Sequence, residues 1–165
     1  MEHLDRNATP GPATAVSEPV AGVIGGLVSG AAYLVAQVSF TAAARPGGAA
    51  EPLQRIAAIL MGPDAAPPPA EFTFTMLGMA LIIHFALAMV FGRIVSVLVW
   101  SRRTGPGVLT GALVGLVLYV VNFGLIAPSA FPWFGDSIRA VTLADHVLFG
   151  AVAAAVCLAL RSPLR

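Results

Sequence analysis

The sequence predicts an all-α integral membrane protein, a bundle of four transmembrane helices with one short interfacial helix after the first span. Hydrophobic residues make up 58% of the 165 residues and charged residues 10%, with a mean hydropathy of +0.87, whereas a soluble domain is about one quarter charged. No acidic residue occurs between Glu71 and Asp136. Four apolar runs of roughly 20 residues, the length that crosses a bilayer, account for most of the chain.

The element boundaries follow from the lengths of the apolar runs and from proline and glycine at their ends. Residues 1–18 are polar and are expected to form a mobile tail before a transmembrane domain over residues 19–165. We expect spans at about 20–43, 72–100, 107–127 and 141–160, the middle two joined by a short turn that makes an antiparallel hairpin. Residues 52–61 are too few to cross a bilayer. They are expected to form an interfacial helix that starts at Pro52 and stops at Gly62-Pro63.

Arginine and tryptophan residues indicate where the spans meet the headgroups and how they are oriented. Arg93 interrupts the second span, and a charge at the bilayer centre costs about 2.5–3.5 kcal/mol or more, so its side chain is expected to reach the headgroups. Trp100 and Trp133 are typical interface anchors. The excess of arginine on one side predicts a multi-pass membrane protein with both termini in the cytoplasm. That side holds Arg6, Arg102, Arg103, Arg161 and Arg165, while Arg45, Arg55 and Arg139 lie on the other.

Glycines at a spacing of four residues predict close helix packing, because they let two backbones approach each other. Gly26 and Gly30 lie in the first span, and Gly111 and Gly115 lie in the third at a constant offset. The same offset relates Gln37 to Asn122, and each set precedes a span that carries one histidine. The pattern suggests an internal repeat of two hairpins in parallel orientation.

A few polar side chains within the spans are the candidates for a functional site, since polar groups in hydrocarbon must face one another or a wet cavity. We expect them to form a pocket that opens to the outside. Adjacent helical residues point about 100° apart, so His146 is expected to face inward and Asp145 the interface, where Arg139 is a candidate partner. The candidate pocket residues are Gln37, His84, Tyr119, Asn122, Asp145 and His146, with Tyr33 nearby.

These polar residues allow a structural and a functional interpretation. Interhelical hydrogen bonds of this kind contribute roughly 0.6–2 kcal/mol to stability, whereas an imidazole can also exchange protons near neutral pH. A bis-histidine haem is not expected, because His84 and His146 differ in estimated depth by about 8–10 Å. No cofactor and no metal site is predicted, since a third clear ligand is lacking. The lone Cys157 is expected to be a packing residue.

Several short motifs together resemble those of small bacterial inner-membrane proteins with four spans and no assigned activity, and more distantly those of YagU-like membrane proteins. They cover most of the chain from about residue 50 onward. Members are sometimes labelled sodium:proline symporters, but the resemblance implies only the location and the span count, because no broken-helix sodium site is visible. The motifs are Arg55 to Pro63 followed by Pro67-Pro68, His84-Phe85, Gly111, Gly115, Tyr119 and Asn122, Phe131-Pro132-Trp133-Phe134, and His146 with Phe149-Gly150.

Three classes of function stay open. The leading one is a non-enzymatic structural or accessory membrane protein that packs against a second copy or another membrane protein, through the glycine-rich first span if that face is free. The alternative is a small oligomeric transporter or proton-linked channel that uses His84 and His146. An enzyme acting on a lipid or quinone comes third. The lipid bilayer is the expected environment. The chain has no lysine and no basic cluster, so nucleic acid is not an expected partner.

Overall fold

The computed structural model describes residues 16–45, 48–67, 71–137 and 139–161, so the predicted N-terminal tail lies outside it as far as residue 15. Throughout the described ranges every regular element is a helix. Four helical stretches are long and apolar enough to cross a membrane, which confirms the predicted all-α bundle. The elements are α1 (Glu18–Ala44), α2 (Glu51–Met61), α3 (Phe74–Val99), α4 (Thr104–Tyr119), the π-helical η3 (Val120–Ile126), α5 (Ala127–Ala130) and α6 (Arg139–Leu160), with short 3-10 turns η1 (Gly48–Ala50), η2 (Pro63–Ala65) and η4 (Pro132–Asp136).

The third span is longer than predicted and contains a wide helical turn. It runs without interruption from Thr104 to Ala130, and its π-helical part includes a hydrogen bond from the Ala127 N–H to the Asn122 carbonyl, five residues back. Pro128 accounts for this turn. A proline lacks an N–H and its ring clashes with the carbonyl four residues earlier, so the helix widens to accommodate it.

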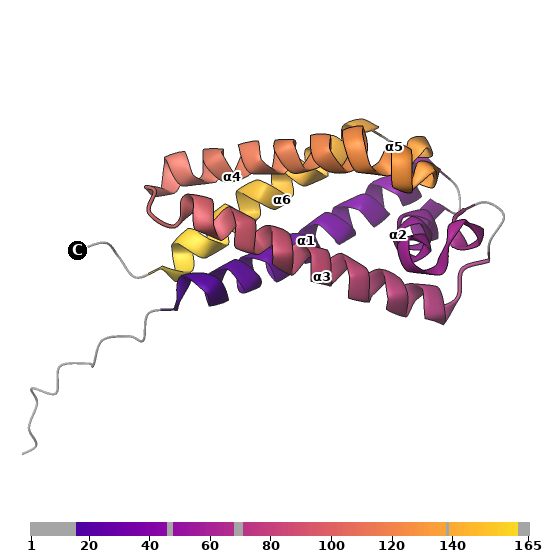
Figure 1. Ribbon diagram of the computed structural model, residues 1–165, viewed down its shortest axis with the longest axis horizontal. Helices are drawn as coiled ribbons and strands as arrows, with labels where there is room; N and C mark the ends of the chain where they lie inside the picture. The colour runs from indigo at the N-terminus through magenta and orange to yellow at the C-terminus, as the bar shows by residue number, and fades with distance from the viewer. Residues whose placement is uncertain (1–15, 46–47, 68–70, 138, 162–165) are drawn as a thin grey trace, which may run out of the picture.

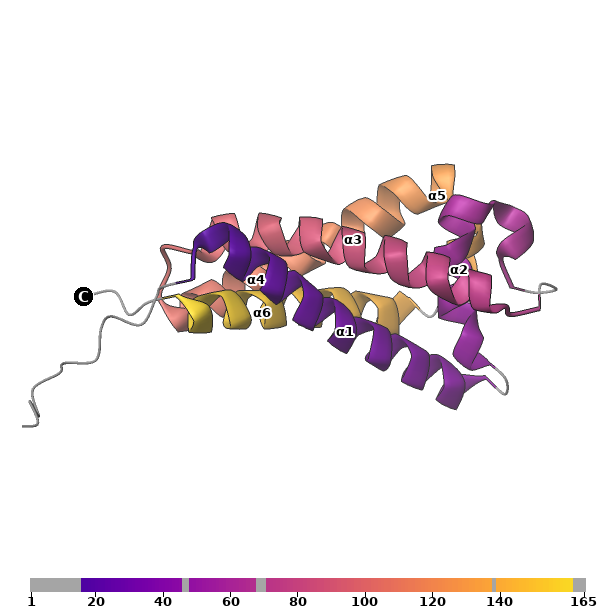
Figure 2. The same ribbon diagram turned by 90° about the horizontal axis from the view of Figure 1, so that it is seen from below.

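The four spans alternate in direction, so the start of α1 and the end of α6 lie at the same end of the bundle (Figure 1). Helices α1 and α6 form the centre, with α3 packed mainly on α1 and α4 mainly on α6. Helix α2 lies at the other end, beside the start of α3, where α1 and α5 finish (Figures 1 and 2). It begins at Glu51, has Pro52 in its first turn and stops at Gly62, whose φ of 90° favours glycine.

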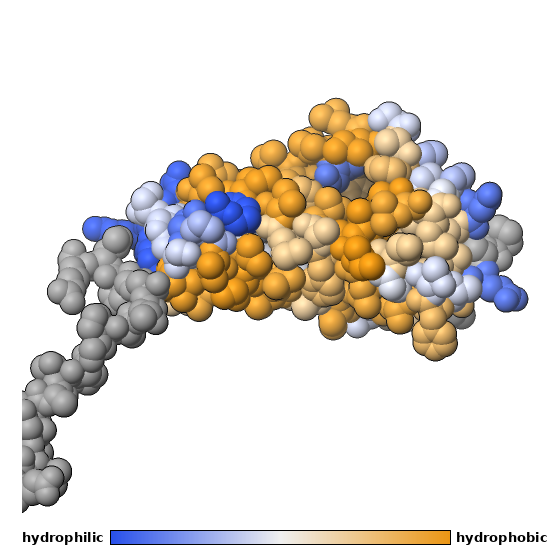
Figure 3. Space-filling model, turned by 60° about the horizontal axis from the view of Figure 1, so that its bottom comes forward, coloured by the Kyte–Doolittle hydropathy of each residue, from blue (hydrophilic) through white to orange (hydrophobic). Residues whose placement is uncertain are grey.

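The surface shows an apolar belt between two polar ends (Figure 3). Large hydrophobic side chains project outward from α3 and α4, for example Ile82, Val97, Leu109 and Val117, each more than half exposed. In water such a surface would be unfavourable, and in a bilayer it is the lipid contact. The chain is therefore a membrane protein.

Glycines bring α1 and α3 into backbone contact. A methyl group placed on Gly26 would lie 2.2 Å from the Ala88 carbonyl oxygen, and one on Gly92 would lie 2.4 Å from the Gly22 carbonyl oxygen. Neither position has room for a side chain. The predicted small-residue face of the first span is therefore occupied inside the bundle.

Helices α1 and α3 form the first hairpin of the suggested repeat, and α4 and α6 form the second. The second hairpin also packs through glycines. A methyl group on Gly111 would lie 2.3 Å from the Gly150 carbonyl oxygen, and one on Gly115 would lie 2.0 Å from the His146 carbonyl oxygen. Each of these glycines on α1 corresponds to a glycine on α4 at one constant offset in residue number. The residue that it contacts on α3 corresponds to a residue on α6 at a second constant offset. This correspondence supports the suggested repeat. The matched contacts are Gly22 on Ser96 with Gly107 on Leu158, Gly26 on Ala88 with Gly111 on Gly150, and Gly30 on His84 with Gly115 on His146.

An ion pair neutralises Arg93 at the end where α1 begins. Its guanidinium lies 2.5 Å from Glu18 Oε1 and donates to Ser96 Oγ at 2.9 Å. The sequence predicts Glu18 in the tail and Arg93 alone at the headgroups, whereas the structure pairs the two across α1 and α3. At the same end Arg161 donates to the main-chain oxygens of Trp100 and Arg102, and so fixes α6 to the turn between α3 and α4.

Candidate functional site

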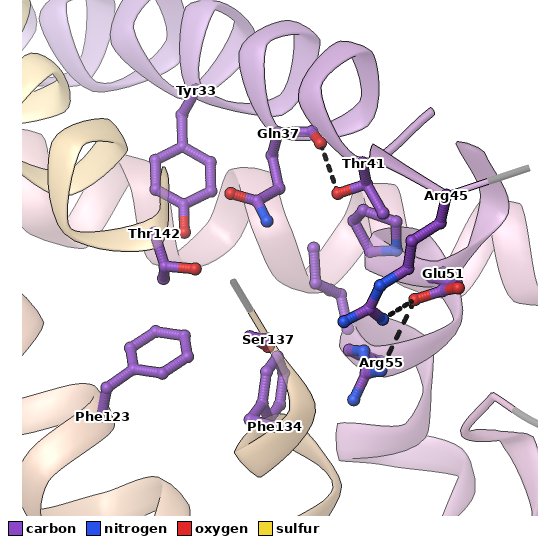
Figure 4. Close-up of a pocket in the computed structure, with 12 residues that line it drawn as sticks. Tyr33, Gln37, Thr41, Arg45, Glu51, Arg55, Phe123, Phe134, Ser137 and Thr142 are labelled. Carbon is purple, nitrogen blue, oxygen red and sulfur yellow. Dashed lines mark hydrogen bonds and ion pairs between the residues drawn. The ribbon is translucent and has the colours of Figure 1, made fainter. Parts of the chain in front are cut away.

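A small polar chamber lies at the α2 end of the bundle, between α1, α2, η3, η4 and α6 (Figure 4). Its volume is about 50 Å³. A cavity needs about 10–15 Å³ on this measure to hold one water molecule, and a polar one is normally wet. The chamber therefore has room for about three water molecules. Helix α1 supplies Tyr33, Gln37 and Thr41 to its wall.

The outer wall of the chamber carries charge. Glu51 accepts a hydrogen bond from Arg45 at 2.8 Å and lies 3.6 Å from the Arg55 guanidinium. The side chain of Arg55 is only 6% exposed. It also donates to the Trp133 carbonyl, and the Trp133 indole N–H donates back to the Arg55 carbonyl at 3.0 Å. This reciprocal pair of hydrogen bonds joins α2 to η4 beside the chamber. The sequence predicts Trp133 as an interface anchor, and in the structure its hydrogen bonds also join η4 to α2.

The inner wall carries an amide oxygen without a partner. Gln37 is 9% exposed and its Oε1 accepts no hydrogen bond from the described residues. Its side chain points into the space between Tyr33 and Arg45 (Figure 4). Thr41, one turn on, donates to the Gln37 main-chain oxygen at 2.8 Å. A buried acceptor without a donor costs about 1–3 kcal/mol, so Gln37 is the natural place for an ordered water in this chamber.

Asp145 is buried, contrary to the expectation that it faces the interface. It is 2% exposed, and its Oδ2 has no hydrogen-bond partner in the part of the chain that is described. The reason is the position of α6, which packs against α1, α3 and α4. Two neighbouring residues that point about 100° apart are therefore both covered. The ion pairs among the described residues do not include Arg139 with Asp145.

Both intramembrane histidines belong to one aromatic cluster that starts at the inner wall. The Tyr33 ring lies 5.7 Å from the His84 ring and 5.1 Å from the His146 ring, and the sequence-predicted Tyr119 lies 5.8 Å from His146. Phe123 adds a further ring contact with His146 at 5.5 Å. Tyr33 thus contacts both histidines, and this brings together residues from α1, α3, α4 and α6.

Each histidine ring is fixed by a main-chain carbonyl. His84 Nε2 lies 2.8 Å from the Gly30 oxygen on the neighbouring helix, and His146 Nδ1 lies 2.8 Å from the oxygen of Thr142 in its own preceding turn. The His84 contact links α3 to α1. Among the described residues no group of three or more His, Cys, Asp or Glu side chains converges as a metal site would need.

The structure groups most, but not all, of the predicted pocket residues. Gln37 lines the chamber, and His84, Tyr119 and His146 lie in the adjoining aromatic cluster. Asn122 is half-buried on η3 and does not line the chamber. Apart from Gln37 and Tyr33, the residues that line the chamber were not predicted as pocket residues, because single threonines and phenylalanines in apolar helices give no signal and the arginines suggested an interface. Among them are Arg55, Phe123, Phe134 and Thr142.

Comparison of the chain with models of known families, with curated proteins and with solved structures gave no match. The resemblance to small four-span bacterial inner-membrane proteins therefore stays a prediction that rests on its short sequence motifs. The geometry of the chamber and of the surface is the remaining guide to function.

Proposed function

We propose that the chain is a non-enzymatic accessory protein of the membrane, which acts through its outer surface while its interior serves as a scaffold. The contact between His84 and the Gly30 carbonyl is the observation that carries the proposal. It uses an intramembrane imidazole to join two helices, and such bonds contribute about 0.6–2 kcal/mol to a membrane bundle.

The outer surface supports the same interpretation. In the most apolar stretch of the third span, Thr104–Ala130, 11% of the residues are buried inside the bundle, compared with 44% for α6. Most residues of this stretch are therefore open to lipid or to another membrane protein. The glycine faces are used internally, so contact with a second copy or a partner would rest on the leucine and valine side chains of α4 and the start of η3. These are Leu109, Leu113, Leu116, Val117 and Val120.

A second candidate is proton-linked transport by a small oligomer. The observation that favours it is the pair of buried oxygens without donors among the described residues, Gln37 Oε1 and Asp145 Oδ2. A water molecule would satisfy either oxygen by donating a hydrogen bond, and only the Asp145 carboxyl can also take up a proton. A closed region lies towards the other end, however, where Ala88, Val95 and Cys157 pack in the hydrophobic core. A proton path through one protomer would need this region to open.

One pair of measurements separates the two candidates. The scaffold interpretation expects the His84→Ala variant to lose thermal stability in detergent, and wild-type proteoliposomes to conduct protons no faster than empty liposomes. A wild-type proton flux above that of empty liposomes would overturn it, if the Asp145→Asn variant abolished this flux and was as stable as the wild type. His3→Ala, outside the described residues, is the matched histidine control.

We also propose a bacterial inner membrane with both termini in the cytoplasm. Arg102, Arg103 and Arg161 lie at the end where α1 begins, and basic residues are retained on the cytoplasmic side. A C-terminal fusion to a reporter that is active only in the cytoplasm tests the orientation. An active periplasmic reporter at the same position would reverse it.

A further inference from the structure

A groove in the side of the bundle is a second hollow, larger than the polar chamber. We call it the lateral groove. Its volume is about 480 Å³, within the range of roughly 300–1,000 Å³ that is typical of ligand sites. It is separate from the polar chamber but shares two wall residues with it, Phe123 and Phe134.

The groove forms where a helix is widened into a π-helical turn and where two glycines carry no side chain. One wall is the π-helical segment and the turn after it, where Pro128 prevents a regular helix. Gly124 and Gly135 leave space. A methyl group on Gly124 would meet only Val120 Cγ1, at 3.8 Å, and one on Gly135 would meet nothing within 4 Å. The absence of side chains at these two positions therefore leaves part of the hollow open.

The chemistry of the groove is that of an amphiphile site. Aromatic and aliphatic side chains form most of it, from Tyr119 to Pro132, while Arg139 is the single cation among the described residues that line it. Arg139 is the exposed first residue of α6, and it takes part in none of the ion pairs between described residues. It lies at the end of a membrane span, where lipid headgroups are located.

The groove is deep enough for part of a lipid acyl chain. His146, which contacts Tyr119 at the inner end of the groove, lies seven residues along α6 from Arg139. At the helical rise this corresponds to about 10 Å into the bilayer. A ligand that spans the groove therefore needs an anionic head at the interface and an apolar chain below it.

We propose that the lateral groove binds one anionic phospholipid, with its phosphate on the Arg139 guanidinium and part of an acyl chain along Phe123, Gly124 and Pro128. Arginine suits this role because its guanidinium is always charged and can donate two parallel hydrogen bonds to a phosphate. The aromatic and proline side chains supply the contact for the acyl chain. The site does not depend on the accessory function proposed above.

Native mass spectrometry of delipidated protein in detergent tests the proposal, with phosphatidylglycerol and phosphatidylcholine as the probes. Wild-type protein is expected to bind one phosphatidylglycerol about tenfold more tightly than phosphatidylcholine. Both lipids carry a phosphate, but the choline ammonium of phosphatidylcholine offsets the attraction of the headgroup to the Arg139 guanidinium. The Arg139→Gln variant should lose this preference, and the Arg103→Gln variant, an exposed arginine at the opposite end of the bundle, should keep it. An equal loss in both variants would mean non-specific charge attraction and would overturn the proposal.

Filling the groove gives the second arm of the test. The Gly124→Leu variant should weaken binding of both lipids at this site by about tenfold or more, while the Gly78→Leu variant, on a position of α3 with nothing within 4 Å, should bind as wild type does. If Gly124→Leu bound phosphatidylglycerol normally, the lipid would lie elsewhere and the assignment would be wrong. Should Gly124→Leu fail to fold, the Arg139→Gln comparison decides alone, because that side chain is exposed.

Discussion

Replacing one interfacial glycine by alanine should destabilise the bundle, because the added methyl group has nowhere to go. At Gly115 it would lie 2.0 Å from the His146 carbonyl oxygen, and ordinary contact for such a pair begins near 3.4 Å. Helices α4 and α6 would have to separate by more than an ångström. A gap of that size removes about a quarter to a half of each dispersion contact along the seam, and overpacking of this kind costs about 1–3 kcal/mol.

The same change at a free position provides the control. A methyl group on Gly78 meets nothing within 4 Å, and alanine is a better helix former than glycine by up to about 1 kcal/mol. Gly78→Ala should therefore be neutral or slightly stabilising. Gly26→Ala, in the other hairpin, should behave like Gly115→Ala, and the double variant should lose about the sum of the two single losses, since the two glycines contact different helices.

Reversible unfolding in mixed detergent micelles, followed by circular dichroism, measures these differences. The two buried variants should lower the free energy of unfolding by about 1–3 kcal/mol each. If Gly26→Ala and Gly115→Ala were as stable as Gly78→Ala, close backbone approach would not be what holds the hairpins, and the packing argument would fail.

Three further predictions concern the two ends and the centre of the bundle. Glu18→Gln should destabilise by about 1–3 kcal/mol because Arg93 loses its partner, and in a double-mutant cycle Glu18→Gln with Arg93→Gln should cost less than the sum of the single changes; additive losses would mean that the ion pair is not coupled. Trp133→Phe removes the indole hydrogen bond to the Arg55 carbonyl, so hydrogen exchange in α2 should accelerate by an amount that corresponds to about 1 kcal/mol while exchange in α6 stays unchanged. Cys157 is fully buried and its thiol donates to a main-chain oxygen, so maleimide labelling should follow global unfolding, and rapid labelling of the folded protein would contradict that burial.

The spans could be predicted from the sequence because their length is imposed by the solvent. A helix that crosses hydrocarbon must be apolar over about 20 residues, and this sets the approximate limits of α1, α3 and α6 whatever the helices pack against. The glycine pairs could be predicted for the same reason, since little else lets two backbones approach in lipid. The rotation of each helix could not be predicted. Asp145 became buried because α6 is central, and centrality depends on all four helices together.

The polar chamber illustrates a second limit of prediction from sequence. Arg55 and Trp133 are 78 residues apart, and their reciprocal hydrogen bonds arise only when α2 meets η4. Each residue alone suggested a lipid interface. The cause of the π-helical turn was, by contrast, visible as Pro128 inside an apolar run. A proline near the end of an apolar run also predicts the end of a span, so the continuation of the helix to Ala130 could not be predicted.

The internal repeat distinguishes the packing that the two hairpins share from the segments in which they differ. Equivalent glycines pack α1 on α3 and α4 on α6 in the same way, so the two hairpins share one packing arrangement. The two hairpins differ in the segment that joins their first helix to their second. The first hairpin inserts α2 there, and the second inserts the π-helical segment and η4.

Both insertions lie at the same end of the bundle (Figure 1), and they meet through Arg55 and Trp133. The polar chamber and the lateral groove are formed at this meeting, on either side of Phe123 and Phe134. The repeated packing needs no ligand to explain it, because close contacts at glycines stabilise helix pairs in a membrane. Packing does not explain why the two insertions are unlike. Variants at this end should therefore alter binding at the proposed phospholipid site more readily than variants at the glycine contacts between helices. The latter should alter stability.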